Sequence, residues 1–512
     1  MTEKADLILY NANIITFDPA KPRATTVAVK DGNILRVGSS DDGNHFTGRK
    51  INCGGKTLIP GFNDAHCHIL AFASSLLSVD CTPSSVSSIN DIKDRIRKRV
   101  QTASDGEWIR AFGYDEFHLA DRRHPNRFDL DEAAPNHPVK LMHRSRHACV
   151  LNSRALALVG ITNETQEPQG GVIDRDLQSG QPSGMLFEMN DYIENKLPPI
   201  SSGEMDRGVK LANEAYLSQG ITSFQDATAS NNLDTWKFFR RLREADSLIP
   251  RLSLMMGLRH LDELLEQGFI PRYGSNDMRL GSLKVIISEA RGCLYPSLDE
   301  LIQMVFQAQS HGFQIAIHAV EENTIAAAVS ALESIYDKSL KNNHRHRIEH
   351  CSVCSDSLLD RLENIRALVV TQPSFIYHSG ERYLETVPEE QQLLLHRISS
   401  FLKSGLKPCA GSDNPVAPLN PLLSIHAAVN RRTQGGNVFF PRERVLPSVA
   451  LEMHTKAASY ASFDEGIKGT ISSGKLADFT LLSDDPLKIM PEKIRDIKVD
   501  ATIIGGEVVW RS

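Results

Sequence analysis

The chain has little that would place it in a membrane, on nucleic acid or outside the cell. No apolar run is long enough to span a bilayer, which argues against a transmembrane helix. The first 20 residues carry acidic side chains and lack the apolar core of a signal peptide, so we do not expect secretion. A formal net charge of −6 offers no electrostatic footprint for nucleic acid or an anionic membrane.

The spacing of the cysteines also gives no sign of disulfide bonds or of a structural metal site. The eight cysteines are spread along the chain, without the paired CxxC spacings of a structural metal site or a disulfide framework. Cys351 and Cys354 do form one CxxC, but two ordinary thiols after a strand are enough to explain it. Reduced thiols are typical of a cytoplasmic protein, which is the location we expect.

What the chain does have is an ordinary globular composition, with 41% hydrophobic and 23% charged residues among 512. Apolar and polar residues alternate near the N-terminus, and Asp31-Gly32-Asn33 marks a hairpin turn there. Two strand-like segments near the C-terminus have Gly505-Gly506 at a turn. We therefore predict that residues 1–57 and 466–512 form one composite β-domain.

Residues 58–465 alternate between short apolar strands and longer helical patterns, which is typical of βα units around a parallel sheet. Eight strands are expected, at 57–61, 221–226, 251–256, 282–288, 314–318, 345–350, 367–372 and 407–411. The helices between them include 298–309 and 389–402. The pattern predicts an α/β fold with a (β/α)8 TIM-type barrel. Residues 73–202 are too many for a crossover loop, so we predict an inserted subdomain after strand one, placed to cap the pocket.

The most informative segment is Leu58–Ile69, where an apolar run meets a Pro-Gly break and ends in His66-Cys-His68. Residues i and i+2 of a strand point to the same face. The two imidazoles can therefore converge on one metal ion, and Asp64 could lie beside them.

Further candidate ligands occur at the ends of the later strands. Strand four carries Lys284, strands five and six end at His318 and His350, and strand eight is followed by Asp413. In a barrel these side chains would meet at one mouth, and imidazole and carboxylate ligands suit Zn²⁺. Alternation in strand four places Lys284 inside, where a lysine is costly unless it is neutralised, paired or modified. Carboxylation by CO₂ would convert it into a metal-bridging carbamate.

These motifs together resemble amidohydrolase family 3, a branch that includes N-substituted formamide deformylases. The resemblance covers nearly the whole chain and rests on several segments: Pro60–His68, Leu130–Pro135, His147–Ser153, Pro168–Ile173, His318, Arg347–His350, Gly411–Asp413 and Gly474–Phe479. It implies the barrel, the composite β-domain and hydrolysis of C–N bonds by a metal-activated hydroxide. The metal ligands that it implies are His66, His68, Lys284, His318, His350 and Asp413, with Asp413 also moving the proton.

One segment departs from the family pattern. An Asp-Gly pair is expected shortly after the strand-four lysine, but this chain has Ser288-Glu289-Ala290-Arg291-Gly292. Glu289 could replace Lys284 as a bridging ligand, or Glu289 and Arg291 could contact the substrate. The number of Zn²⁺ ions per chain, one or two, is therefore open.

Other candidates lie near predicted strand ends or in the insertion. His147 could donate a hydrogen bond to the substrate carbonyl and so act in catalysis. Four more residues could line the pocket, namely Asp226, Tyr377, His378 and Asn414.

The function we predict is metal-dependent hydrolysis of an amide, formamide or cyclic amide bond in a small molecule. The alternatives are a mononuclear deaminase that uses Glu321 or Glu322, an esterase or lactonase on the same site, and a non-catalytic binding protein. We expect a small-molecule substrate, no nucleic acid and no membrane as partners, and by analogy a homodimer.

Overall fold

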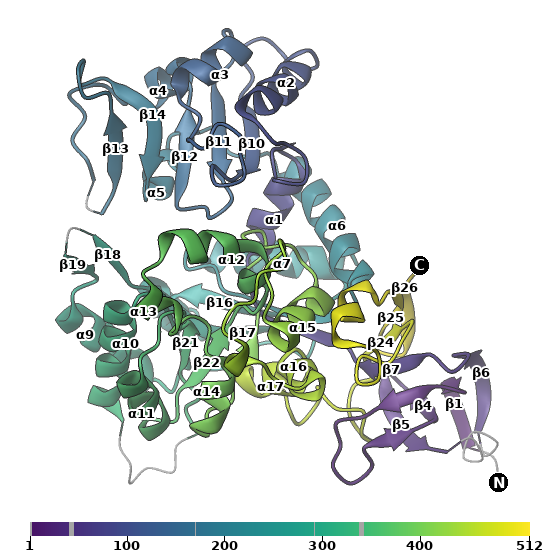
Figure 1. Cartoon of the computed structure of the whole chain (residues 1–512). Helices are drawn as coiled ribbons and strands as arrows, with labels where there is room; N and C mark the ends of the chain where they lie inside the picture. The colour runs from purple at the N-terminus through teal and green to yellow at the C-terminus, as the bar shows by residue number, and fades with distance from the viewer. Residues whose placement is uncertain (1–2, 40–45, 169, 291, 337–342) are drawn as a thin grey trace. The chain divides into compact units, whose positions relative to one another are not determined.

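The computed structural model describes residues 3–39, 46–168, 170–290, 292–336 and 343–512 (Figure 1). The chain divides into two compact units. One contains residues 1–68 and 213–512, and the other contains residues 69–212.

Eight parallel strands of the first unit form a nearly closed barrel. In sheet order they are β8 (Phe62–Cys67), β15 (Ile221–Asp226), β16 (Arg251–Gly257), β17 (Met278–Ile286), β20 (Ile315–Ala319), β21 (Arg347–His350), β22 (Leu368–Thr371) and β23 (Cys409–Ala410). The two end strands adjoin, because the Asp413 N–H, just after β23, donates to the His66 carbonyl at 2.8 Å. The predicted (β/α)8 architecture is therefore confirmed.

Helices follow most of these strands, and their ends are set by the local sequence. Helix α9 (Leu298–Ser310) begins where Ser297 Oγ accepts from the Glu300 N–H and the Glu300 carboxylate accepts from the Ser297 N–H. Its buried face carries Leu301, Val305 and Ala308 at helical spacing. The other larger helices of this unit are α7 (Leu233–Glu244), α10 (Glu322–Ile335), α11 (Asp356–Asn364), α12 (Ser374–Thr386) and α15 (Pro421–Asn430). Helix α6 (Ser202–Ser218) begins in the other unit and ends in this one.

Two sequence predictions about elements are wrong. The run at 57–61 is not the first barrel strand: β7 (Thr57–Pro60) belongs to the terminal sheet, and barrel strand one is the next segment, β8. The Pro60-Gly61 break separates two consecutive buried strands, which the apolar pattern alone does not distinguish. The helix predicted at 389–402 is instead two short helices, α13 (Glu389–Gln392) and α14 (Ile398–Lys403), because His396 between them adopts a left-handed φ of 48°.

Two further sheets of the first unit are built from the ends of the chain. One sheet has the order β26-β25-β24-β7-β2-β3, in which C-terminal β24 (Phe479–Leu482) pairs antiparallel with N-terminal β7 (Figure 1). The other strands of that sheet are β2 (Asn13–Ile15), β3 (Arg23–Ala24), β25 (Val499–Ile504) and β26 (Glu507–Arg511). A second sheet joins β1 (Glu3–Tyr10), β4 (Thr26–Lys30), β5 (Asn33–Gly38) and β6 (Phe46–Asn52). The predicted turns at Asp31-Gly32 and Gly505-Gly506 are confirmed, each with positive φ at both residues.

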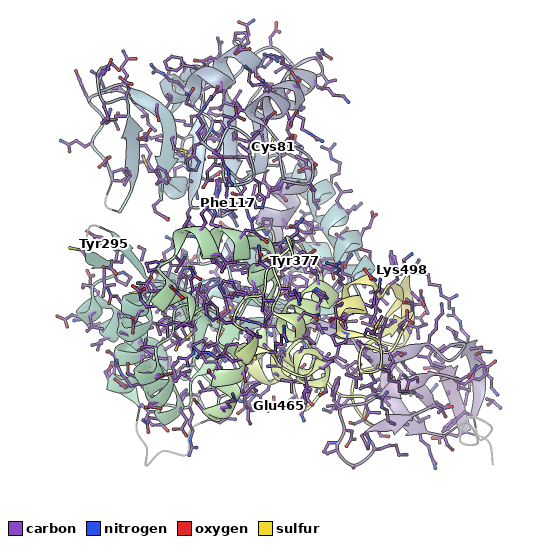
Figure 2. The ribbon with its side chains drawn as sticks, in the orientation of Figure 1. Cys81, Phe117, Tyr295, Tyr377, Glu465 and Lys498 are labelled. Atoms are coloured by element: carbon purple, nitrogen blue, oxygen red, sulfur yellow. The ribbon has the colours of Figure 1, made fainter. Side chains whose placement is uncertain are left out.

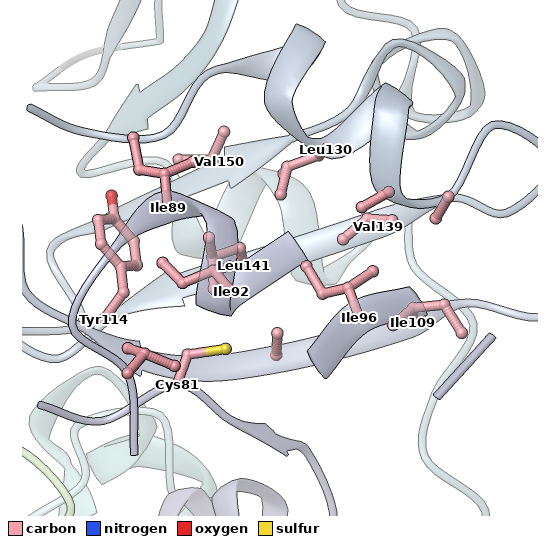
Figure 3. Packing of buried hydrophobic residues seen from close by; sticks show 14 of the residues in the cluster. Cys81, Ile89, Ile92, Ile96, Ile109, Tyr114, Leu130, Val139, Leu141 and Val150 are labelled. Atoms are coloured by element: carbon pink, nitrogen blue, oxygen red, sulfur yellow. The ribbon is translucent and has the colours of Figure 1, made fainter. Parts of the chain in front are cut away.

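The second unit is the insertion after the first barrel strand. Its sheet has the order β13-β14-β12-β11-β10-β9, and β9 (Val79–Asp80), β10 (Ile109–Tyr114) and β11 (Val139–His143) are parallel. The antiparallel strands are β12 (Ala148–Leu151), β13 (Val172–Arg175) and β14 (Pro182–Phe187). Helices α2 (Ile89–Val100) and α3 (Arg127–Ala133) bury Ile92, Ile96 and Leu130 in a core of this unit's own (Figure 3). Across the part of the chain described here, none of the helices combines the length and apolarity that crossing a membrane requires.

Candidate metal centre

Three residues converge at the carboxyl ends of barrel strands. His66 lies in β8, His350 ends β21 and Asp413 follows β23, and one ligand atom from each lies within 4.8 Å of the other two. His66 Nε2 is 3.5 Å from Asp413 Oδ1, and all three residues are buried. The fold therefore brings together two imidazoles and one carboxylate that are far apart in sequence.

The other predicted ligands border this trio. His68 Nε2 lies 3.1 Å from Asp413 Oδ1, and the His318 ring centroid is 4.5 Å from that of His350. Lys284 lies in β17, beside β20, and is only 2% exposed. Its Nζ makes no hydrogen bond within the described part of the chain.

Backbone conformation at the strand ends aims these side chains. His350 and Asp413 both have left-handed backbones, with φ of 71° and 56°. Such angles are costly for non-glycine residues and occur most often at functional sites. At Gly411 a Cβ would lie 2.7 Å from the His66 backbone nitrogen, so only glycine lets β23 approach β8 this closely.

Three of the histidines keep Nε2 directed at the centre because Nδ1 is engaged elsewhere. His66 Nδ1 is 2.5 Å from Glu349 Oε2, and His68 Nδ1 is 2.8 Å from Thr228 Oγ1. His350 Nδ1 is 2.8 Å from Gln372 Oε1. Metal-binding histidines use outer partners of this kind to fix the tautomer and the ring orientation.

The supporting roles of these residues were not predicted from the sequence. Glu349 accepts from Arg347 Nε at 2.6 Å, and Arg347 also donates to Gln225 Oε1 and to the Ala65 carbonyl. Arg347 and Glu349 share one strand and are fully buried, which is tolerable only for a hydrogen-bonded pair. The sequence feature that could have revealed these supporting residues is the pair of charged residues in the short strand Arg347-Ile-Glu-His350.

Asp64, which we expected beside the histidines, supports the neighbouring loop. Its Oδ1 accepts from the Ser412 N–H at 2.9 Å, and its Oδ2 accepts from Ser412 Oγ at 2.5 Å. Burial raises the pKa of Asp64 to about 6. The carboxylate thus ties β8 to the loop that carries Asp413.

Burial and charge set the protonation states of the trio. Burial lowers the pKa of His66 to about 3, and burial also lowers the pKa of His350. Burial alone would raise the pKa of Asp413, but the hydrogen bond from His68 and the nearby imidazoles lower it overall. Neutral imidazoles beside an ionised carboxylate are the forms that bind a metal ion.

Burial likewise lowers the pKa of Lys284, to about 8, against the opposing charge of Glu349. An amine with a lowered pKa is uncharged more readily. That state favours a modification such as carboxylation.

Two of the predicted substrate residues support the histidines from close by. Asp226, at the end of β15, accepts from the Thr228 N–H at 3.1 Å and so holds the residue that contacts His68. The Asn414 carbonyl accepts from the His68 N–H at 2.9 Å. Both side chains are buried.

The remaining candidates lie outside the trio. Tyr377, labelled in Figure 2, and His378 lie in the first turns of α12, and Tyr377 Oη accepts from Arg495 Nη1 at 3.2 Å. Glu289 is exposed on the hairpin of β18 (Ser288–Ala290) and β19 (Cys293–Tyr295), where it accepts from Asn323 Nδ2 at 3.2 Å. Arg291 lies outside the described residues. His147 belongs to the insertion, with its Nδ1 2.7 Å from Glu188 Oε1. Pocket-lining and catalytic roles for these residues stay predictions.

This donor set fits a divalent metal ion. Nitrogen and oxygen ligands in a buried, preoriented cluster suit Zn²⁺ and related ions. The buried Lys284 amine, which has no hydrogen-bond partner within the described residues, is the kind of group that a metal site can absorb after modification.

Comparisons with known proteins agree with this fold. An N-substituted formamide deformylase from Arthrobacter pascens is 29% identical, over 99% of this chain and 98% of its own length. The Protein LONG AFTER FAR-RED 3 of Arabidopsis thaliana is 27% identical, over 99% and 92%. A crystal structure of an uncharacterized metal-dependent hydrolase from Pyrococcus horikoshii OT3 shares the fold, with a TM-score of 0.76 at 22% identity over 95% of this chain and 99% of that one. The model of the amidohydrolase family matches residues 49–510, and the chain belongs to that family.

Proposed function

We propose that the protein is a metal-dependent hydrolase that cleaves a C–N bond in a small amide, with an N-substituted formamide as the first substrate class to test. The observation that carries the proposal is the set of three imidazoles whose Nδ1 atoms are held, around the carboxylate of Asp413. The formamide class comes from the name of the full-length relative that is 29% identical.

His66, His350 and Asp413 would hold the ion, most simply Zn²⁺, with His68, His318 and Lys284 beside them. When bound, such an ion polarises a carbonyl oxygen and lowers the pKa of water. Carboxylation of Lys284 would add an anionic ligand and permit a second ion.

The chain's own part in the reaction is proton transfer at Asp413. Because its pKa is lowered, this carboxylate is ionised and can accept a proton from the attacking water. Water adds to the carbonyl carbon, the C–N bond breaks, and Asp413 returns the proton to the leaving nitrogen. The products are formate and an amine.

The test is formate release from a panel of N-alkyl and N-aryl formamides by zinc-loaded protein. We expect Asp413→Asn to lower kcat/KM by roughly 10²–10⁴, the usual contribution of general acid–base catalysis. Asp360→Asn, on the outer helix α11, is the matched control and should leave kcat/KM unchanged.

Matched acetamides, esters and aminoheterocycles belong in the same panel. Ammonia release from an aminoheterocycle without formate release from any formamide would replace the proposal with a deaminase. Full activity of Asp413→Asn would remove the proton-transfer role.

A further inference from the structure

We propose that the insertion contains a second divalent-metal site of its own, formed by Asp115, Glu116 and His143. One ligand atom from each of these residues lies within 4.8 Å of the other two. All three belong to the unit of residues 69–212, so the site is independent of the function proposed for the barrel.

The position in the sheet is one where ligands commonly bind. Strands β10 and β11 are parallel neighbours, with Tyr114 opposite His143 at their carboxyl ends. Asp115 and Glu116 follow β10 directly, and His143 ends β11. In open α/β sheets, ligands bind beyond the carboxyl ends of parallel strands.

His143 provides the strongest evidence. The residue is 4% exposed, and its Nε2 makes no hydrogen bond within the described residues, although Glu116 Oε2 lies only 2.9 Å away. The geometry of this close pair leaves the buried nitrogen without a hydrogen bond in the described residues, which is costly. An ion that both atoms contact would satisfy the nitrogen and use the carboxylate oxygen beside it.

The opposite side of the same ring is anchored. Ser145 presents its hydroxyl oxygen at 2.7 Å and its backbone N–H at 3.1 Å to His143 Nδ1. The backbone N–H of Ser145 is the donor at Nδ1, so the two contacts fix the ring with Nε2 on the side of Glu116.

Several groups hold Asp115 in place. Its Oδ2 accepts from Arg144 Nη1 at 2.8 Å and lies 3.1 Å from His118 Nδ1. Its Oδ1 accepts from the N–H of Phe117, a residue labelled in Figure 2, at 3.1 Å. These contacts orient the Asp115 carboxylate, whose two oxygens offer about four lone-pair sites in all.

The ligand chemistry selects the kind of ion. One imidazole and two carboxylates suit Zn²⁺ or Co²⁺ better than Ca²⁺, which prefers six to eight oxygens. Three protein ligands leave a coordination position for water. An ion there would join the loop after β10 to the end of β11.

The experiment counts metal ions in the full-length protein. Chelator-stripped protein is dialysed against Zn²⁺, and zinc per chain is measured for wild type, His143→Gln and Glu116→Gln. We expect each variant to hold one zinc ion fewer than wild type. Glu132→Gln is the matched control, because Glu132 is an insertion carboxylate paired with Lys93 and Arg97, and it should match wild type.

A second background separates this site from the barrel. The double variant His66→Ala/His350→Ala should keep one zinc ion, and adding Glu116→Gln should remove it. When Co²⁺ replaces zinc, the double variant should show visible absorption from the bound cobalt ion. This absorption should disappear when Glu116→Gln is added to the double variant. If His143→Gln does not fold, as judged by circular dichroism, Glu116→Gln decides the question. Equal zinc content in wild type and folded Glu116→Gln would overturn the proposal and leave a metal-free hydrogen-bond network.

Discussion

His66, His68 and His350 each engage one ring nitrogen with a residue outside the metal centre. Their partners differ in kind: the carboxylate of Glu349, the hydroxyl of Thr228 and the amide of Gln372. Each partner fixes its ring without competing for Nε2. The affinity of the centre should therefore depend on residues that never contact the ion.

Removing the hydroxyl of Thr228 tests directly whether such a partner affects the affinity for zinc. Thr228→Val keeps the shape of the side chain and removes only the contact with His68 Nδ1. We expect the zinc affinity of the barrel to fall by about 10- to 100-fold, the usual cost of losing such a partner. Competition with a chromophoric chelator measures it.

Thr386→Val is the control, because Thr386 is exposed on α12 and its hydroxyl donates only to the Arg382 carbonyl within the described residues. Unchanged zinc affinity in Thr228→Val would show that the orientation of His68 does not depend on this contact.

The candidate ligands could be chosen from the sequence because each lies in, ends or follows a short buried strand, where topology determines which side chains meet. Their role as metal ligands stays a prediction. The residues that contact the Nδ1 atoms of the histidines were harder to predict. Gln372 and Thr228 occupy positions where many residue types would fit a loop, and only the three-dimensional register reveals their contacts. The left-handed backbones of His350 and Asp413 were also invisible, since no glycine marks them.

At the scale of elements, a buried ion pair connects the barrel to the terminal sheet. Arg251, at the start of β16, donates from Nε and Nη2 to the two oxygens of Asp478, just before β24, at 2.6 and 3.0 Å. Both side chains are nearly inaccessible. This buried ion pair therefore links two segments that lie 227 residues apart in the sequence.

Arg251→Met should destabilise the protein by about 3–5 kcal/mol, because it leaves the Asp478 carboxylate buried without its main partner. Urea denaturation, followed by a signal from the first unit, measures this loss in the free energy of unfolding. Lys237→Met removes an exposed lysine from α7 and should stay within about 0.5 kcal/mol of wild type. Equal stability of the two variants would contradict the structural role assigned to the pair.

Sequence patterns predicted whether a segment forms a helix or a strand better than they predicted which strands pair. The strand at 221–226 and the helix beginning at Leu298 were predicted closely, since apolar periodicity and a capping box determine them. The error at 57–61 arose because β7 and β8 are both continuous buried strands. Which sheet receives each one depends on pairing with β24 or with β15, and local pattern carries no information about that choice.

For the whole molecule, the two compact units have separate cores. Ile92 is fully buried in the core of the insertion, on α2 (Figure 3). Ile92→Ala should cost about 2–5 kcal/mol in that core, with little effect on the barrel. Hydrogen exchange should then accelerate at β10 and β11 and stay unchanged at β20 and β21.

Leu158→Ala, which truncates an exposed leucine of the same unit, is the control and should change neither set of amides. Equal acceleration in both units would mean that the two cores unfold as one cooperative structure.

If His66, His350 and Asp413 hold a catalytic metal ion, replacing the two histidines should lower the metal content of the protein. Elemental analysis should be carried out on wild type and on His66→Ala/His350→Ala, purified side by side without added metal. Wild type should carry at least one more divalent ion per chain than the double variant. Equal metal content in the two folded proteins would contradict it.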